Sequence, residues 1–286
     1  MRILLTNDDG IYAPGLAAMA EALARLGEVF VVAPATEKSG VGHSITYLIP
    51  LVVKEVYRGD KRWGWAVEGS PADCVKIGIA ELCPERPDLI VSGINGGLNA
   101  GINVLYSGTV AAAIEGAFFG IDSVAVSLQF DEHAPFEKAA ELAAELIGRL
   151  FENRTEGPRL YNLNIPLAAI EGKPETAVVP MDVTQYGEKY EKRFDPWGRA
   201  YYWATGEPRP TLPDRPTDLT ALAEGKITIT PLHFDLTDRR ELERLRDKTF
   251  ELTPAKGENE RRSDDRLILR TTRKQQQISP QPQSDS

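Results

Sequence analysis

Residues 2–33 read RILLTNDDGIYAPGLAAMAEALARLGEVFVVA, and they carry the pattern from which the fold can be predicted. Residues 2–6 and 29–33 are short apolar runs of the kind that form buried strands. Between them, apolar residues recur at helical spacing from Leu16 to Leu26. A strand, a helix and a second strand in so short a stretch form a βαβ unit, so the two strands are predicted to lie parallel.

The same alternation continues along the chain. Further helices are predicted at residues 72–82, 109–119 and 135–151, and further strands at residues 88–92, 123–128 and 160–165. Regular alternation of strands and helices is typical of a mostly parallel sheet that is covered by helices on both faces. The sequence therefore predicts an α/β fold, a three-layer sandwich.

Two segments depart from this alternation. Residues 44–56 and 63–68 are rich in β-forming residues, and the polar turn between them predicts a hairpin-like insertion. Residues 176–231 are irregular and rich in Pro, Tyr and Trp, which predicts a β-rich appendage with long loops.

The end of the chain has a different character. Thr237 is predicted to cap a final helix that runs to about Arg246. Residues 255–286 are polar and end in QQQISPQPQSDS, a composition that cannot bury a core and predicts disorder. We therefore expect one α/β domain over residues 1–250, with the β-rich appendage within residues 176–246, and a disordered tail.

Composition excludes several classes of function. The chain has 286 residues and a net charge of -9, and its first 250 residues contain no basic stripe, which argues against a nucleic-acid polymer as partner. No apolar run approaches the ~20 residues that span a bilayer, and the N-terminus lacks the pattern of a signal peptide. We expect a cytoplasmic protein with no membrane partner. Cys74 and Cys83 have the spacing of neither a zinc site nor a redox pair, and Cys74 is predicted to be buried in a helix.

Polar segments follow the predicted strands, at the edge where open α/β sheets bind their ligands. Four such segments are expected to meet there: Thr6–Gly10, Pro34–Gly40, Ser92–Asn99 and Ser107–Thr109. Candidate ligand groups are therefore predicted to gather at one edge of the sheet.

Asp8 and Asp9 stand side by side directly after the first strand. Two carboxylates, together with hydroxyl and amide oxygens nearby, suit a hard cation such as Mg²⁺ or Mn²⁺, which would relieve the repulsion between the two acids. Gly10 permits the sharp turn that such convergence needs. The alternative is that one aspartate caps the following helix and the other is solvated.

The third and fourth segments suit a phosphate. The loop of residues 95–101 is rich in glycine, which lets a backbone approach a ligand closely, and Ser107–Thr109 opens a helix whose free N–H groups favour an anion. An ordinary helix cap by Ser107 or Thr109 is the alternative. Neither a P-loop nor a GxGxxG motif is present, so a dinucleotide cofactor is not expected.

Other candidates are weaker. Ser39 could bind a metal or a phosphate because it follows a strand, and His43 in the same loop is either a proton donor or incidental. The aromatic cluster Tyr201–Trp203, with Arg193 and Arg199 near it, could stack on a base and bind a phosphate, or it could pack a small core or a subunit contact.

These segments together resemble the SurE family of survival nucleotidases. The matching stretches are ILLTNDDGIYAPGL, APATEKSGVGHSIT, GSPADCVKIGI, the long run from Pro87 to Leu128, NLNIP, DPWGRAYYW, TDLTALAEGKITITPL and DLT, and they cover roughly residues 1–238. The resemblance implies a Rossmann-like core and a divalent-metal-dependent phosphomonoesterase that hydrolyses nucleoside 5′-monophosphates. The resemblance also implies that 3′-monophosphates and short polyphosphate are further possible substrates. It implies as well a homodimer or homotetramer that is assembled through C-terminal elements.

The resemblance also assigns residues. Its metal ligands would be Asp8, Asp9, Ser39 and Asn95, holding one Mg²⁺ or Mn²⁺ ion per subunit. Its phosphate pocket would be lined by Asn99, Ser107, Gly108 and Thr109. We expect Asp8 and Asp9 to be the catalytic pair. Apart from the resemblance, our own hypothesis for the mechanism is that Asp8 holds the metal and Asp9 accepts the proton of the attacking water. The loop SGVGHSIT departs from the family pattern, because His43 stands where we expect Asn.

Two functions are carried forward from the sequence. The first is a 5′-nucleotidase, and the second is a non-catalytic sensor that binds a nucleotide or phosphate without turnover. A covalent aspartyl-phosphate is not expected, because the DxDx[TV] pattern is absent. Base preference and the choice between 5′ and 3′ phosphates depend on the shape of the pocket.

Overall fold

The computed structural model describes residues 1–153, 156–184, 189–206, 212–250 and 252. The chain divides into two compact units, residues 1–236 and residues 237–286. The tail that we predict to be disordered, residues 255–286, lies outside the described residues. Within the described ranges, no helix is long and apolar enough to cross a membrane.

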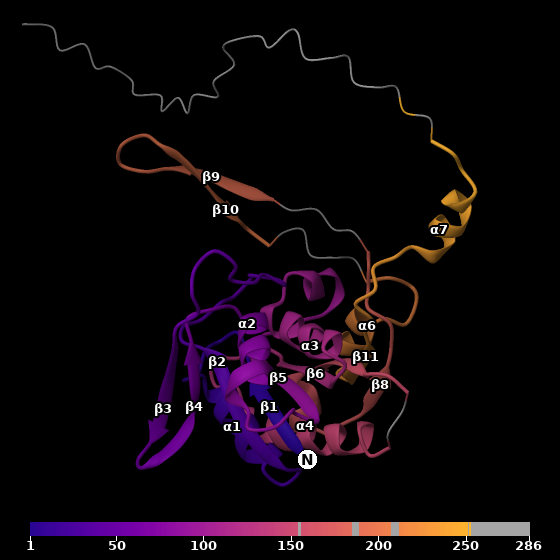
Figure 1. Cartoon of the computed structure of the whole chain (residues 1–286). Coiled ribbons are helices and arrows are strands. Elements are labelled where there is room, and N and C mark those ends of the chain that lie inside the picture. Colours follow the sequence, from indigo (N-terminus) through magenta and orange to yellow (C-terminus); the bar gives the residue numbers. More distant parts are fainter. Residues whose placement is uncertain (154–155, 185–188, 207–211, 251, 253–286) are drawn as a thin grey trace, which may run out of the picture. The chain divides into compact units, whose positions relative to one another are not determined.

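A central sheet organises the first unit (Figure 1). Among the described residues it has nine strands in the order β3-β4-β2-β1-β5-β6-β7-β11-β8. Their bounds are β1 Arg2–Thr6, β2 Glu28–Pro34, β3 Val53–Arg58, β4 Lys61–Val67, β5 Leu89–Gly96, β6 Asp122–Leu128, β7 Leu160–Ile165, β8 Thr176–Val178 and β11 Ile227–Pro231. The run from β4 to β7 is parallel throughout, which confirms the mostly parallel sheet.

Helices cover both faces of this sheet, because successive side chains of a strand point to opposite faces. Ile3 and Leu5 of β1 pack with α1 (Pro14–Leu23) and α4 (Phe136–Leu150). Leu4, between them, packs with α2 (Pro71–Ile77) and α3 (Gly108–Phe118). Figure 1 shows the two helix pairs on opposite sides of the sheet. The predicted three-layer sandwich is confirmed.

The direction in which the chain builds the sheet reverses between β1 and β5. From β1 the chain first builds outward through β2 on one side, and it returns to build β5, β6 and β7 on the other side. At such a reversal the connections leave β1 and β5 in opposite directions, which opens a ligand-binding crevice beyond their carboxyl ends. Both the segment after Thr6 and the end of β5 meet at this point.

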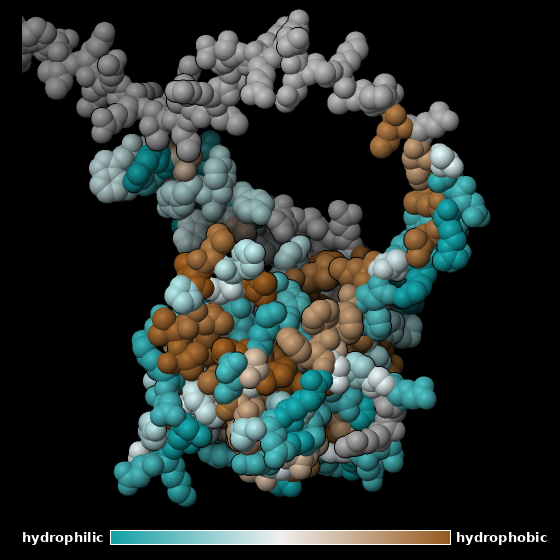
Figure 2. All heavy atoms as spheres, in the orientation of Figure 1, coloured by the Kyte–Doolittle hydropathy of each residue, from teal (hydrophilic) through white to brown (hydrophobic). Residues whose placement is uncertain are grey.

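The predicted hairpin exists, but it begins later and has a different place. The strand starts at Val53, whereas residues 44–52 form no strand, and Tyr47 and Leu48 are 84% and 89% exposed. Figure 2 shows other apolar residues, coloured brown, on the surface of this face of the molecule. β3 pairs antiparallel with β4, and β4 pairs with β2, so the hairpin is an edge of the central sheet rather than a separate insertion.

Two further elements differ in extent. β5 continues to Gly96 where we predicted an end at Ser92; its pairing with β6 shifts register between Ser92 and Asn95, across a cis Gly93–Ile94 peptide. The predicted helix of residues 72–82 is α2 followed by a π-helical turn, Gly78–Leu82.

The C-terminal third is only partly an appendage. Strands β8 and β11 join the central sheet beside β7, and α6 (Asp218–Ala223) leads into β11, so this part of the prediction was wrong. In the described structure β9 (Tyr190–Phe194) and β10 (Ala200–Ala204) pair with each other alone, as an antiparallel hairpin. The other elements are the short helix α5 (Leu167–Glu171), the 3₁₀ turn η2 (Gly101–Leu105) and, in the second unit, α7 (Arg239–Arg246). The cap of α7 is Asp238 rather than the predicted Thr237.

Candidate active site

The turn after β1 is stabilised by Asn7, which is fully buried. Its side-chain amide donates to the carbonyl of Gly10 and its side-chain oxygen accepts from the N–H of Gly10, each at 3.1 Å. Gly10 has φ +101°, a conformation that favours glycine. This turn ends the strand, so Asp8 and Asp9 leave the alternating geometry in which they would face apart.

Asp8 lies against the beginning of α3. The hydroxyl and the N–H of Thr109 both donate to its carboxylate. A Cβ on Gly108 would lie 2.9 Å from the Cβ of Asp8, so only glycine permits this approach. The alternative that an aspartate caps the following helix was wrong: α1 follows Ala13, which makes no side-chain cap in the described structure. Asp8 instead contacts a helix that begins a hundred residues later.

Both carboxyls are disfavoured as anions. Burial raises the pKa of Asp8 even though the hydrogen bonds from Thr109 oppose the change. Burial, then the charge of Asp8, raises the pKa of Asp9 to about 6, while the N–H of Gly96 opposes this. Glu37 adds negative charge near both. The site thus concentrates negative charge where little water can screen it, which is the condition that a bound cation relieves.

The segments that carry the predicted metal ligands are joined by hydrogen bonds, and the N–H of Gly96, next to Asn95, donates to the carboxylate of Asp9. The N–H of Lys38 donates to the carbonyl of Asp8 at 2.7 Å, which holds the neighbouring Ser39 beside the turn after β1. The hydroxyl of Ser39 donates to Glu37 at 2.6 Å. The amide nitrogen of Asn95 is used by the carbonyl of Gly97, at 2.7 Å, which leaves the side-chain oxygen of Asn95 as its acceptor.

The donor set is mixed. In the part of the chain that the structure describes, no group of three or more His, Cys, Asp and Glu side chains could hold a metal. The set here is two carboxylates with a hydroxyl and an amide oxygen, all of them oxygen donors. Such a set fits Mg²⁺ or Mn²⁺ with part of its coordination left to water, and it does not fit a soft metal.

The predicted phosphate residues lie next to this set. The hydroxyl oxygen of Ser107 accepts from the N–H of Val110 at 3.1 Å, so Ser107 caps α3 and keeps its own hydrogen for another acceptor. The amide nitrogen of Asn99 lies 2.8 Å from the hydroxyl of Ser127 and 3.5 Å from that of Thr109. Thr109 therefore joins Asp8 to Asn99.

Sequence reasoning missed the residues that hold Asn99. Asn162 and Asn164 of β7 both donate to the carbonyl of Asn99, at 2.7 and 3.0 Å, and Asn164 accepts from its N–H at 2.8 Å. The two asparagines are two positions apart on a predicted strand and so share a face, a signal that could have found them.

His43 is paired, which the sequence did not indicate. Its Nε2 lies 2.6 Å from a carboxylate oxygen of Glu115, which is buried on α3, and Lys76 lies 3.5 Å from the other oxygen. The N–H of Gly42 donates to the carbonyl of Tyr106 at 3.0 Å. The loop after Ser39 is thus attached to α3 and to the segment that precedes Ser107.

The later part of this loop, at Ser44 and Thr46, is hydrogen-bonded to α2 and its cap. Asp73 accepts from the N–H of Thr46 at 3.0 Å and from its hydroxyl at 2.7 Å, and Ser70 donates to the carbonyl of Ser44 at 2.7 Å. Burial alone would raise the pKa of Asp73, but the hydrogen bonds from Thr46 and Ser70 hold it below its usual range.

The C-terminal segment supports the site as well. Asp218, fully buried at the start of α6, accepts from the N–H of Gly101 at 2.8 Å and from that of Asp182 at 2.9 Å. It therefore supports the turn between Asn99 and Ser107, and no local pattern in the sequence indicates this.

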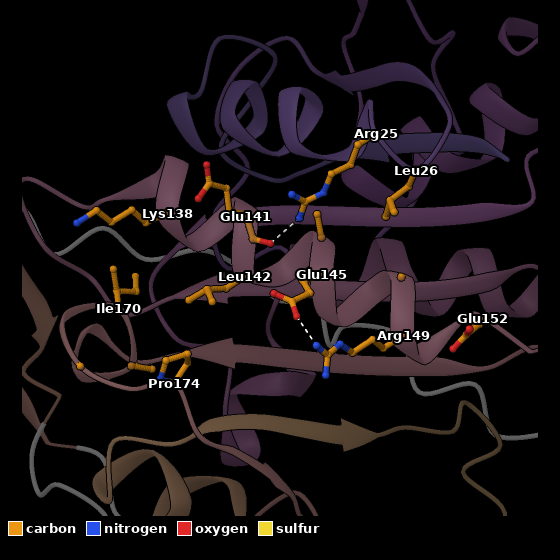
Figure 3. Close-up of a pocket in the computed structure, with 14 residues that line it drawn as sticks. Arg25, Leu26, Lys138, Glu141, Leu142, Glu145, Arg149, Glu152, Ile170 and Pro174 are labelled. Atoms are coloured by element: carbon orange, nitrogen blue, oxygen red, sulfur yellow. Dashed lines mark hydrogen bonds and ion pairs between the residues drawn. The ribbon is translucent and has the colours of Figure 1, made fainter.

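Two other features carry no site chemistry. A hollow of about 780 Å³ is lined by α4, by α5 and by Arg25 and Leu26, which follow α1. Figure 3 shows Arg25 donating to the carbonyl of Glu141 and Arg149 paired with Glu145. The hollow contains none of the residues at the strand ends. Cys74 is fully buried, as predicted, and burial raises its pKa well above the usual value.

The aromatic cluster does not pack a core in the described structure. Tyr201, Tyr202 and Trp203 are all exposed on β10. Asp195 accepts from the N–H groups of Trp197 and Arg199 at 2.9 Å and so holds the tip of the hairpin. The aromatic side chains of this hairpin are therefore exposed to solvent.

Comparison with known proteins gives a consistent result. A family model described as survival protein SurE matches residues 3–193. A curated protein of Rhodopirellula baltica named 5′-nucleotidase SurE is 60% identical over 252 residues, which cover 86% of this chain and 98% of that protein. A protein of the same name from Pelotomaculum thermopropionicum is 48% identical over 249 residues, 86% of this chain and 94% of that one. The crystal structure of the SurE protein from Aquifex aeolicus matches with a TM-score of 0.73 and 36% identity, over 86% of this chain and 100% of that chain.

Proposed function

The chain belongs to the SurE family, and from this premise we propose that it is a 5′-nucleotidase that hydrolyses nucleoside monophosphates with the aid of one divalent metal ion. As an enzyme it is a hydrolase, the class that its relatives' name denotes. The observation that carries the proposal is that Asp8 and the start of α3 lie in direct contact. The carboxylate of Asp8 suits a cation, and the free N–H groups at the start of α3 favour an anion. A metal ion bound together with a phosphate needs both kinds of group.

Asp8, Asp9, Ser39 and Asn95 would hold the ion, either Mg²⁺ or Mn²⁺. The fit rests on the oxygen donors described above and on the raised pKa of both aspartates. When bound, a divalent ion supplies Lewis acidity toward the phosphate and neutralises the two carboxylates. Without that neutralisation, two acids beside Glu37 would repel an anionic substrate.

The chain's own groups divide the remaining work. Asp8 is held in place by its hydrogen bonds from Thr109, and we assign to Asp9 the role of accepting the proton of the attacking water. Ser107 has a hydroxyl hydrogen to donate to a phosphate oxygen. The amide nitrogen of Asn99 has a second hydrogen, which makes only a 3.5 Å contact with Thr109 and can donate to another phosphate oxygen. These donors would stabilise charge on the transferring oxygens.

Phosphate release tests the proposal directly. The purified chain should release phosphate from AMP or GMP with Mn²⁺ or Mg²⁺, and EDTA should abolish the release. Asp9→Asn should lower kcat/KM at least about 100-fold, since charge stabilisation and proton transfer contribute at this level. Asp60→Asn, at an exposed aspartate of the β3–β4 turn, is the matched control. Full activity of Asp9→Asn would contradict the assignment.

The same assay separates the enzyme from the nucleotide sensor. A sensor would bind AMP in a calorimetric titration and release no phosphate under any metal. A panel of 5′- and 3′-nucleotides and short polyphosphate, crossed with Mg²⁺ and Mn²⁺, would define the substrate range and the metal.

We also propose that the β9–β10 hairpin forms the subunit contact of a homodimer or homotetramer. This proposal is supported by the exposed aromatic side chains of the hairpin, since Tyr202 and Trp203 are both 59% exposed. Exposed aromatic clusters are typical of interfaces. Trp203→Lys should reduce the mass measured by analytical ultracentrifugation, and Tyr57→Lys, at an exposed tyrosine of β3, should not. An unchanged mass for Trp203→Lys would refute this role.

A further inference from the structure

We infer that Asn162 and Asn164 are positioning residues of the reaction, which act by holding Asn99 in place in the phosphate pocket. The inference rests on the proposed function, because it gives Asn99 a contact with the substrate. It assigns a role to the NLNIP stretch, which lies outside the metal and phosphate segments.

The backbone of Asn99 is fully used by these two side chains. Asn164 accepts from its N–H at 2.8 Å and donates to its carbonyl at 3.0 Å, and Asn162 donates to the same carbonyl at 2.7 Å. A loop residue normally satisfies these groups with water or with neighbouring backbone. Here a strand side chain clamps both groups of one loop residue, which fixes its orientation.

We call Asn162 and Asn164 the clamp, and the buried strands around it hold it rigidly. Asn162 and Asn164 are fully buried on β7, a strand paired with β6 on one side and β11 on the other. Ser127, also fully buried and opposite Asn164 on β6, fixes the side-chain amide of Asn99 at 2.8 Å. Three side chains from two strands thus orient one residue of the glycine-rich loop beside Thr109.

The face of the sheet that carries the clamp contains buried polar atoms that make no hydrogen bond in the described part of the chain. The side-chain oxygen of Asn162 and the hydroxyls of Thr228 and Thr230 have no hydrogen-bond partner in the described part of the chain. Thr230 lies opposite Asn162, and Thr228 lies opposite Asn164, on the neighbouring strand. An asparagine that leaves its own oxygen unpaired in the core costs stability. Its donation to Asn99 is the contact that accounts for its presence.

A graded series of variants tests the inference. Asn164→Ala removes a donor and an acceptor of the clamp, and it should lower kcat/KM for AMP by about 10- to 100-fold, as a misplaced catalytic group does. Asn162→Leu removes one donor and also the unpaired oxygen, so it should fold well and lower kcat/KM by a smaller factor. Thr228→Val is the matched control: it replaces an equally buried but unpartnered hydroxyl on the same face with an isosteric methyl, and it should leave kcat/KM within twofold.

Two readouts separate positioning from general stability. The affinity for Mn²⁺, measured by calorimetry, should stay within threefold of the unmodified chain in Asn164→Ala, because Asp8 and Asp9 do not contact the clamp. In a double-mutant cycle, Asn164→Ala should cost less than about threefold in an Asn99→Ala background, since it acts through the Asn99 side chain.

The outcomes are distinct. Independent, multiplicative effects of Asn99→Ala and Asn164→Ala, or an Asn162→Leu variant as active as Thr228→Val, would overturn the inference alone. If the unmodified chain releases no phosphate, the proposed function fails, and the inference that rests on it fails too.

Discussion

Replacing Gly108 with alanine would measure how closely the start of α3 must approach Asp8. The added methyl would lie 2.9 Å from the Cβ of Asp8, 3.1 Å from its carboxylate oxygen and 3.2 Å from Pro71. Ordinary carbon contacts begin near 3.4 Å, so Asp8 or the helix start has to move by about 0.5 Å. Asp8 has little freedom to yield, because Thr109 and the backbone of Lys38 hold it.

The expected effects on stability and on activity differ in size. Overpacking of this kind costs about 1–3 kcal/mol, and alanine in a helix returns up to about 1 kcal/mol relative to glycine. The free energy of unfolding should therefore fall by about 0–3 kcal/mol. A shift of half an ångström at Asp8, which we propose as a metal ligand, should lower kcat/KM for AMP about 10- to 100-fold and weaken Mn²⁺ binding.

Gly148 supplies the control for this experiment. It lies in α4, and a methyl there would sit 3.5 Å from Leu26, an ordinary contact. Gly148→Ala should raise the free energy of unfolding by about 0.5–1 kcal/mol and leave kcat/KM unchanged. Denaturant unfolding and a Mn²⁺ titration of AMP hydrolysis would be run on both variants. If Gly108→Ala behaves like Gly148→Ala in both assays, the close contact with Asp8 has no role in the reaction.

Three further outcomes are expected. Because the pKa of Asp9 is raised to about 6, the metal-free fold binds this proton more tightly than the unfolded chain, so its contribution to stability should decrease as pH rises from about 4 to 6; Asp9→Asn should remove this slope in urea melts. His43→Ala leaves the buried carboxylate of Glu115 with Lys76 alone and should cost about 1–2 kcal/mol in the free energy of unfolding, whereas His133→Ala at an exposed loop should cost less than about 0.5 kcal/mol. Mn²⁺ at 100 times its Kd should stabilise the fold by about 2.7 kcal/mol, and an equal thermal shift with and without EDTA would contradict a metal site.

Much of the architecture could be predicted from local pattern. Helical spacing from Leu16 to Leu26 predicted α1, and the apolar runs predicted the parallel strands β1, β2, β5, β6 and β7. Such signals are strong because the face that a helix or strand buries dictates its own periodicity. Residues 44–52 show the limit, since they contain β-forming residues but are mostly exposed and form no strand. A tendency to form strands needs a neighbouring strand to act on.

The C-terminal strands could not be placed by the same means. β11 pairs antiparallel with β7 and parallel with β8. Nothing in the residues of β11 distinguishes a strand of the central sheet from one of a separate appendage, because both alternate in the same way. Which strands pair depends on long-range packing rather than on the strand itself.

For the candidate site, the sequence by itself determined the chemical groups and their place at the ends of strands: two aspartates after β1, and serine, threonine and glycine at a helix start. Only the tertiary structure decided what these groups contact. Asp8 meets Thr109 rather than the helix that follows it, His43 pairs with Glu115, and Asn162 and Asn164 hold Asn99 from another strand. The physical reason is that periodicity and turn chemistry act over a few residues, whereas these contacts join residues about 60 to 100 positions apart and exist only once the sheet has brought its strand ends together.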